Sequence, residues 1–150
     1  KRNQTHIKLT DKNMTRFNIS LDEAIDLVLL SLKKANGGEI FVPKLKSYRL
    51  LDLAKAIVPK AKISFTGIRP GEKIHEEMIS FTESANTIEY KNYFVILPSF
   101  RDYKITDYIK KNGGKKITKK YSYSSDTNKD YLKISEIKKI ISNFKLDDSL

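Results

Sequence analysis

Apolar residues recur at helical spacing over the stretch SLDEAIDLVLLSLKK, which begins at Ser20. One face of the predicted helix carries Leu21, Ala24, Ile25, Val28 and Leu32. Ser20 and Glu23 have the spacing of a capping box, and two consecutive glycines at 37 and 38 end the pattern. We therefore expect a helix that begins at Ser20 and covers neighbouring strands with its apolar face.

Three further stretches predict helices. The stretch SYRLLDLAKAIVP places four apolar residues on one face before Pro59 ends it: Leu50, Leu53, Ala54 and Ile57. KIHEEMIS, residues 73–80, predicts a short helix. SEIKKIISNF, from Ser135 to Phe144, predicts a terminal helix with Ser135 at its N-cap.

Short runs rich in β-branched and aromatic residues predict the strands. They lie at residues 5–10, 15–19, 39–43, 62–68, 87–90 and 93–98. Strand and helix signals alternate, so the predicted fold class is α/β. We expect residues 1–100 to form this α/β region, and residues 101–150 to form a basic C-terminal segment with an irregular loop and a terminal helix.

Composition describes one soluble domain, or a large piece of one. The chain has 150 residues, of which 31% are charged and 39% hydrophobic. It contains no cysteine and only two histidines, far apart in sequence, so we expect neither disulfides nor a metal site. Its longest apolar run, Ala24 to Leu32, is shorter than the ~20 residues of a membrane-spanning helix, and no signal peptide is evident. The predicted location is the cytoplasm.

The net charge of +11 raises the question of a polyanionic partner. Thirteen of the 29 basic residues follow position 100, without a helical stripe or an interleaved aromatic ladder. Such a diffuse distribution is typical of a solvated face rather than a nucleic-acid site. A basic polyanion-binding module remains an alternative function.

The stretch TGIRPGEKIHEEMIS, residues 66–80, contains the most specific candidate chemistry. Pro70 biases Arg69 toward an extended conformation, Gly71 permits a sharp turn, and the predicted helix would then offer free backbone N–H groups. The planar guanidinium of Arg69 matches phosphate oxygens, and Glu72 can accept hydrogen bonds from sugar hydroxyls. These features favour a nucleoside diphosphate. The alternative is a surface ion pair between Arg69 and Glu72.

Five motifs carry a resemblance to a known family. In chain order they are MTRFNISLDEAIDLVLLSL, GGEIFVPK, DLAKAI, GIRPGEKIHEEMIS and YSYSSDTNKDYLKISEIKKII. Together they resemble the C-terminal half of the inverting UDP-N-acetylglucosamine 4,6-dehydratases, enzymes of surface-polysaccharide biosynthesis in the extended short-chain dehydrogenase superfamily. The resemblance implies the substrate-binding part of that fold, with the N-terminal Rossmann half absent.

The resemblance also implies roles for three residues. Arg16 of MTRF and Arg69 would bind the UDP diphosphate from two sides, and Glu72 would accept a hydrogen bond from the uridine ribose. The alternative for Arg16 is a surface charge at a strand edge. His75 is expected to pack on the turn, and no residue of this chain is assigned to catalysis, to a cofactor or to a metal.

The chain lacks the motifs of the family's other half. It has no glycine-rich dinucleotide-binding loop, and none of its eight tyrosines is followed four positions later by lysine. It also begins without methionine, so we expect a fragment that is not catalytic alone. In the full-length enzyme the resemblance implies NADP bound by the Rossmann half, a UDP-sugar substrate and a homo-oligomer. Apolar faces near Phe41 and Phe65 would then lie exposed where that half docks.

An equivalent part of a UDP-sugar 4-epimerase is the alternative enzyme, because it would share Arg16, Arg69 and Glu72. Only the SSDTN motif, residues 124–128, favours the dehydratase over the epimerase.

Overall fold

The computed structural model describes residues 5–99 and 104–143, which divide into two units. Unit 1 comprises Lys1–Asn18, Lys46–Glu76 and Asn128–Leu150, and unit 2 comprises Ile19–Leu45 and Glu77–Thr127. Each unit therefore combines segments that are distant in sequence.

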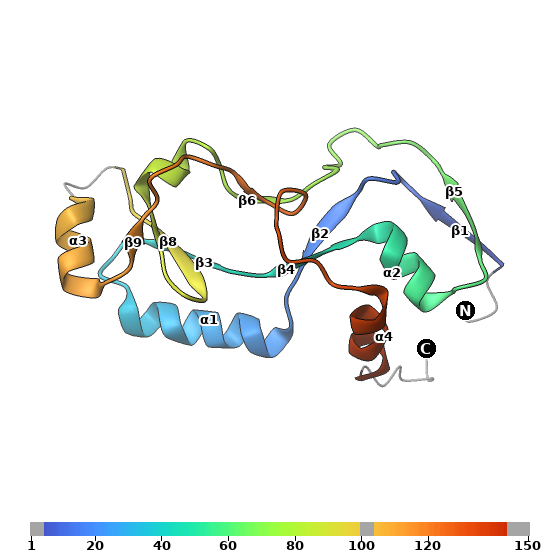
Figure 1. The fold of residues 1–150 in the computed structure, drawn as a ribbon, viewed down its shortest axis with the longest axis horizontal. Coiled ribbons are helices and arrows are strands. Elements are labelled where there is room, and N and C mark those ends of the chain that lie inside the picture. The colour runs from blue at the N-terminus through green and yellow to red at the C-terminus, as the bar shows by residue number, and fades with distance from the viewer. Residues whose placement is uncertain (1–4, 100–103, 144–150) are drawn as a thin grey trace. The chain divides into compact units, whose positions relative to one another are not determined.

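Unit 1 contains two pairs of short strands and two helices (Figure 1). Strand β1 (His6–Leu9) pairs in parallel with β5 (Lys62–Phe65). Strand β2 (Thr15–Asn18) pairs antiparallel with β4 (Lys46–Arg49), which places Arg16 opposite Tyr48. Helix α2 (Leu50–Ile57) packs against α4 (Ile134–Asn143). Their core contains the buried residues Ala56, Leu132 and Ile137.

Unit 2 is built on a four-stranded antiparallel sheet (Figure 1). The strand order is β3 (Ile40–Pro43), β8 (Tyr93–Ile96), β7 (Thr87–Glu89) and β9 (Lys115–Lys116). The remaining elements are α1 (Leu21–Lys34), β6 (Glu77–Ile79), the short 3-10 helix η1 (Glu83–Asn86), α3 (Ile105–Asn112) and β10 (Tyr123–Ser124), which pairs with β6. The core of the unit contains Ile88, Val95, Leu97 and Tyr108.

The predicted α/β class is confirmed, and so are the helices near Ser20 and Leu50. The capping box forms as predicted: the hydroxyl of Ser20 accepts from the N–H of Glu23 at 3.2 Å, and the carboxylate of Glu23 accepts from the N–H of Ser20 at 2.8 Å. The expectation that α1 covers a sheet with its apolar face is wrong, because none of its residues is buried. Leu21 and Leu32 are each 76% exposed.

The two predicted exposed positions differ in outcome. Phe65 is 48% exposed, as predicted. Phe41 itself is half-buried and packs against the core of unit 2, but its neighbour Ile40 is 55% exposed, so an exposed apolar side chain does lie near Phe41. Further exposed apolar surface gathers on α1.

Several predicted elements differ from the structure. KIHEEMIS forms no helix, because β6 pairs with β10 and Ile79 is completely buried. The supposedly irregular region 101–133 contains α3, β9 and β10. Helix α4 begins at Ile134, which places Ser135 in its first turn rather than at its N-cap. Phe144 lies outside the described residues.

Candidate functional site

The turn that carries Arg69 lies at the surface of unit 1, where residues 65–71 are all exposed. Gly71 has φ of 80°, a conformation that side chains disfavour, and the N–H of Glu72 donates to the carbonyl of Arg69 at 3.0 Å. The N–H of Gly67 donates to the carbonyl of Thr10 at 3.1 Å. The end of β1 therefore holds the beginning of the turn.

Glu72 holds the other end of the same turn. Its Oε2 accepts from the backbone N–H of Arg69 at 3.2 Å, and its Oε1 accepts from the hydroxyl of Thr10 at 3.1 Å. Among the described residues no ion pair joins Glu72 to the guanidinium of Arg69, so the predicted alternative of a surface ion pair is not what forms. The carboxylate orders the backbone instead.

In the part of the chain that the structure describes, Arg69 forms its hydrogen bonds with its backbone and not with its side chain. Its backbone is hydrogen-bonded on both sides, whereas its guanidinium has no hydrogen-bond or ion-pair partner within residues 5–99 and 104–143. A fixed backbone that presents a solvated planar cation is suited to bind a phosphate group from solution. The expected contribution of a helix N-terminus is absent here, because residues 73–76 are not helical.

Among the described residues the guanidinium of Arg16, unlike that of Arg69, is hydrogen-bonded to other groups of the protein. Its Nη1 donates to the carbonyls of Thr15 at 2.6 Å and Ile74 at 3.0 Å, and its Nη2 donates to the carbonyl of Lys73 at 2.9 Å. Its Nε lies 3.6 Å from Oε1 of Glu76. The side chain is only 21% exposed, so it is not the free strand-edge charge that was the alternative. The structure brings Arg16 onto the segment that follows Arg69 and Glu72.

The same edge of β2 is joined to residues 74–76 by further bonds. The N–H of Thr15 donates to the carbonyl of Ile74 at 3.0 Å, and the hydroxyl of Thr15 lies 2.8 Å from Nδ1 of His75. Oε2 of Glu76 accepts from the N–H of Phe17 at 2.8 Å. His75 thus contacts β2 and lies outside a helix, so the predicted helix is wrong and the packing of His75 on the turn stays a prediction. Burial, followed by the negative charge of Glu76, raises the pKa of Tyr48, the cross-strand neighbour of Arg16.

The sequence motifs point to Arg16, Arg69 and Glu72 but not to Thr10 or Glu76. Thr10 is 62 positions from its partner Glu72, and Glu76 is 59 positions from its partner Phe17. No local pattern marks either residue, because both act through pairing between β2, the end of β1 and the turn. That Arg16 and Arg69 bind one diphosphate from two sides stays a prediction.

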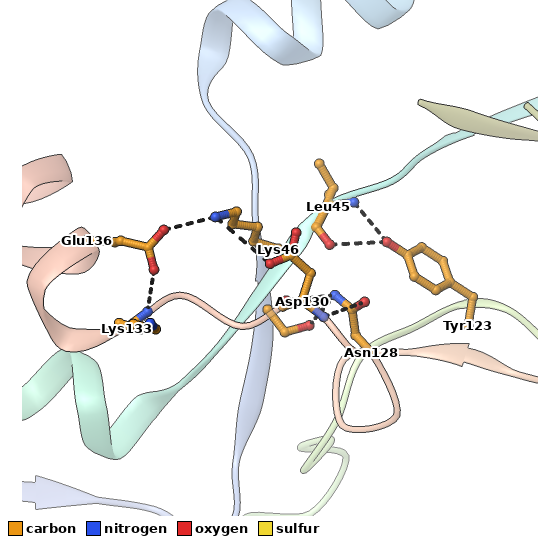
Figure 2. Close-up of polar contacts among 8 residues, drawn as sticks. Leu45, Lys46, Tyr123, Asn128, Asp130, Lys133 and Glu136 are labelled. Atoms are coloured by element: carbon orange, nitrogen blue, oxygen red, sulfur yellow. Dashed lines mark hydrogen bonds and ion pairs between the residues drawn. The ribbon is translucent and has the colours of Figure 1, made fainter. Parts of the chain in front are cut away.

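The SSDTN motif is committed to contacts within the chain (Figure 2). In unit 1 the amide of Asn128 donates to the hydroxyl of Ser47 at 3.0 Å and to the carbonyl of Asp130 at 3.2 Å. The N–H of Ser47 donates to that same carbonyl at 2.8 Å. In unit 2 the hydroxyl of Tyr123 accepts from the N–H of Leu45 at 2.8 Å. Asn128 of the motif therefore holds β4, and Tyr123, the residue before the motif, holds the segment between β3 and β4.

Lys46 and Glu136 form an ion pair of 2.9 Å beside this motif (Figure 2). Glu136 also accepts from the N–H of Lys133 at 2.8 Å. This N–H, and then Lys46, lowers the pKa of Glu136. The ammonium of Lys46, the carboxylate of Glu136 and the N–H of Lys133 all have their partners inside unit 1. We therefore interpret this cluster as structural.

A pocket of about 380 Å³ lies elsewhere, within unit 2. Lys33, Tyr90, Tyr108 and Lys111 are among its lining residues, and none of the three predicted site residues is. The described residues contain no cluster of histidine, cysteine and acidic side chains that could hold a metal, and no helix among them is long and apolar enough to cross a membrane.

Residues 1–98 match the family described as polysaccharide biosynthesis protein. The inverting UDP-N-acetylglucosamine 4,6-dehydratase of Campylobacter jejuni serotype O:2 is 40% identical over 143 residues, which cover 91% of this chain and 42% of that protein. A UDP-glucose 4-epimerase of Rickettsia bellii is 36% identical over 141 residues, with 91% and 41% covered. The X-ray structure of Pen from Bacillus thuringiensis matches 95% of this chain and 41% of its own, with a TM-score of 0.74 and 28% identity. The chain spans about two fifths of the length of these relatives.

Proposed function

Because this chain belongs to the polysaccharide biosynthesis protein family, we propose that it is the UDP-sugar-binding part of an inverting UDP-N-acetylglucosamine 4,6-dehydratase. The identity of 40% to such an enzyme supports this choice of activity. The relatives are more than twice as long as their match to this chain, so the reaction itself is assigned to the whole protein and not to residues 1–150 alone.

The observation that carries the proposal is the state of Arg69. Its backbone is fixed by Glu72, while its guanidinium is exposed and has no partner among the described residues. A diphosphate would supply the oxygen acceptors that match this planar fork. Each charge-assisted hydrogen bond of this kind contributes about 1.5 to 3 kcal/mol. Arg69 is therefore the principal diphosphate ligand in the proposal.

Glu72 and Arg16 complete the proposed site. Each carboxylate oxygen of Glu72 accepts one internal hydrogen bond, which leaves a second lone pair for a ribose hydroxyl. Arg16 donates three hydrogen bonds to backbone carbonyls, and one N–H of Nη2 remains for a phosphate oxygen. The three residues differ in how much of their hydrogen-bonding capacity is available to a ligand.

NADP and the catalytic groups are assigned to polypeptide outside this chain. The chain's six glycines occur at 37, 38, 67, 71, 113 and 114, in turns and caps rather than in a glycine-rich loop between a strand and a helix. The residues of this chain therefore fit the substrate and not the dinucleotide. When bound in the whole protein, NADP would supply the oxidation and reduction of the sugar.

The exposed face of α1 fits a docking role in the whole protein. Five apolar residues on it are 47% to 76% exposed: Leu21, Ile25, Val28, Leu29 and Leu32. Ile40, at the start of the following strand β3, is 55% exposed. Contiguous apolar surface of this kind marks an interface in soluble proteins. We assign it to the additional polypeptide that the relatives possess, because they continue well beyond the 42% that this chain covers.

A UDP-sugar 4-epimerase is the second candidate, and the identity of 36% to a UDP-glucose 4-epimerase favours it. Both activities would use the same UDP-binding residues. The two are separated by incubating the intact protein with UDP-N-acetylglucosamine and identifying the product. Loss of water from the sugar supports the dehydratase, whereas an isomer of unchanged mass supports the epimerase.

Calorimetric titration of the intact protein with UDP tests the shared part of the proposal. UDP is expected to bind, and UMP to bind more weakly because it lacks the second phosphate. Absence of UDP binding would contradict the proposal. Salt-sensitive binding to heparin without UDP binding would favour the polyanion-binding module instead.

A further inference from the structure

Arg16 is committed mainly to the protein's own backbone. A guanidinium has five N–H donors. In Arg16 both hydrogens of Nη1 and one of Nη2 are donated to carbonyls, of Thr15, Ile74 and Lys73, and Nε faces the carboxylate of Glu76 at 3.6 Å. At most one donor is left for a ligand. This is the opposite of Arg69, whose guanidinium has no partner in the part of the chain that the structure describes.

We propose that Arg16 and Glu76 are a positioning pair, which holds residues 73–76 against β2 and thereby sets the shape of the turn that presents Arg69 and Glu72. The ligand in this inference is a diphosphate, and that part of the inference rests on the proposed function. Arg16 acts on that ligand mainly through the turn and has one remaining N–H for direct contact, whereas Arg69 contacts the ligand with its whole guanidinium.

The contacts define how the pair transmits its effect. The carbonyl of Lys73, which Arg16 holds at 2.9 Å, belongs to the residue directly after Glu72. The carbonyl of Ile74 accepts from both Arg16 and the N–H of Thr15. Residues 73 and 74 are thus fixed on one side of Glu72, and the hydroxyl of Thr10 fixes the carboxylate of Glu72 itself. Movement of the Lys73 peptide would move Glu72.

Glu76 orients Arg16 from the far end of the segment. One oxygen of its carboxylate faces Nε of Arg16, and the other accepts from the N–H of Phe17 at 2.8 Å. Since Phe17 is buried in β2, this bond ties Glu76 to a fixed strand. The carboxylate therefore neutralises the arginine and fixes the direction of its fork.

Lysine cannot replace Arg16 in this arrangement. Its ammonium group donates from one nitrogen, whereas the three carbonyls are held from two nitrogens of a planar fork. Arg16→Lys keeps the charge and loses the geometry. Glu76→Gln keeps an acceptor and loses the charge, which makes it the milder of the two variants.

Hydrogen exchange and UDP titration on the intact protein together test the pair. In the ligand-free protein, Arg16→Lys is expected to speed exchange at the N–H groups of Thr15 and Glu72 by about tenfold or more, because the hydrogen bonds that order them weaken. The amides of the unit 2 core, such as Val95, are expected to exchange at unchanged rates. UDP affinity is expected to fall about tenfold in the same variant.

Two further variants serve as controls. Arg69→Lys is expected to weaken UDP binding without any change in exchange at Thr15 or Glu72. Glu89→Gln, which removes the ion pair of Glu89 with Lys44 in unit 2, is expected to change neither property. Glu76→Gln is expected to repeat the effects of Arg16→Lys at smaller size, and it provides the test if Arg16→Lys does not fold.

Unchanged exchange in both Arg16→Lys and Glu76→Gln would overturn the inference, and weaker UDP binding at unchanged exchange would mean that Arg16 acts as a direct ligand only. If the unaltered protein does not bind UDP, the proposed function fails. The exchange rates, which are measured without ligand, then still decide whether Arg16 and Glu76 position the turn.

Discussion

Thr10 donates its hydroxyl hydrogen to Oε1 of Glu72 at 3.1 Å, across 62 positions of sequence. The second oxygen of the same carboxylate accepts from the N–H of Arg69 at 3.2 Å. A threonine just after β1 thus helps to fix the carboxylate that shapes the Arg69 turn. The turn depends on residues outside its own motif.

Replacement of Thr10 by valine is expected to lower the free energy of unfolding by about 0.5 to 1.5 kcal/mol, because the substitution removes one hydrogen bond and preserves the side-chain shape. Denaturant unfolding of the intact protein measures the effect. Thr118→Val is the matched control, since Thr118 is exposed and its side chain makes no hydrogen bond within the described residues. Equal stability of the two variants would mean that the Thr10 hydroxyl contributes nothing to the turn.

Arg69→Lys is expected to weaken UDP binding about ten- to a hundredfold in the intact protein. The substitution keeps the charge and removes the planar fork, which would cost about 1.5 to 3 kcal/mol of binding. Calorimetric titration with UDP measures the change. Arg49→Lys is the matched control, because Arg49 is an exposed arginine of unit 1 that lies over the ring of Tyr131. Unchanged affinity in folded Arg69→Lys would make Arg69 an ordinary turn residue.

Local patterns in the sequence predicted the helices best. The capping box at Ser20 and the apolar spacing after Leu50 involve residues within a few positions of each other, so they can be read directly. Helix α3 also carried such a signal, in Ile105, Tyr108 and Ile109 followed by a glycine at 113. The lysines around these residues made the helical pattern hard to recognise in the sequence.

The segment after Gly71 could not be predicted in this way. KIHEEMIS has helical spacing, yet Ile79 pairs with Tyr123 and the carbonyl of Ile74 accepts from Thr15. These partners lie tens of positions away, and their bonds outweigh the weak local preference for a helix. For the same reason the sequence identified Arg16 as a candidate but did not reveal its contacts with Lys73 and Ile74.

Substitution of Leu32 by glutamate tests the docking role of α1. Leu32 is 76% exposed here, so the change would be nearly neutral if that face remained in solvent. If the face is covered in the intact protein, Leu32→Glu is expected to destabilise it by about 1.5 to 3 kcal/mol, from the loss of one buried leucine side chain. Thermal unfolding of the intact protein measures the difference.

Lys33→Glu is the control for this experiment, because it introduces the same residue at the next position of the same helix. Its expected cost is a few tenths of a kcal/mol, from the interaction of the new charge with the helix dipole. Similar losses in the two variants would argue against a covered apolar face.

The capping box of α1 predicts a pH dependence of stability. The backbone N–H of Ser20, and then its hydroxyl, lower the pKa of Glu23. A carboxylate with a depressed pKa in the folded state contributes stability above its unfolded pKa of about 4.3, and this contribution is lost as pH falls through the folded value. Stability of the intact protein is therefore expected to fall on acidification below about pH 5.

Ser20→Ala removes the hydroxyl partner of Glu23 and is expected to reduce the part of this pH dependence that the box supplies. The variant is also expected to lose about 1 kcal/mol at neutral pH, the usual cost of an N-cap serine. Urea unfolding at neutral and acidic pH measures both effects. Ser31→Ala is the control: Ser31 lies in the same helix and donates to the carbonyl of Leu27, away from the box. If Ser20→Ala and Ser31→Ala respond to acid identically, the pKa of Glu23 does not depend on the Ser20 hydroxyl.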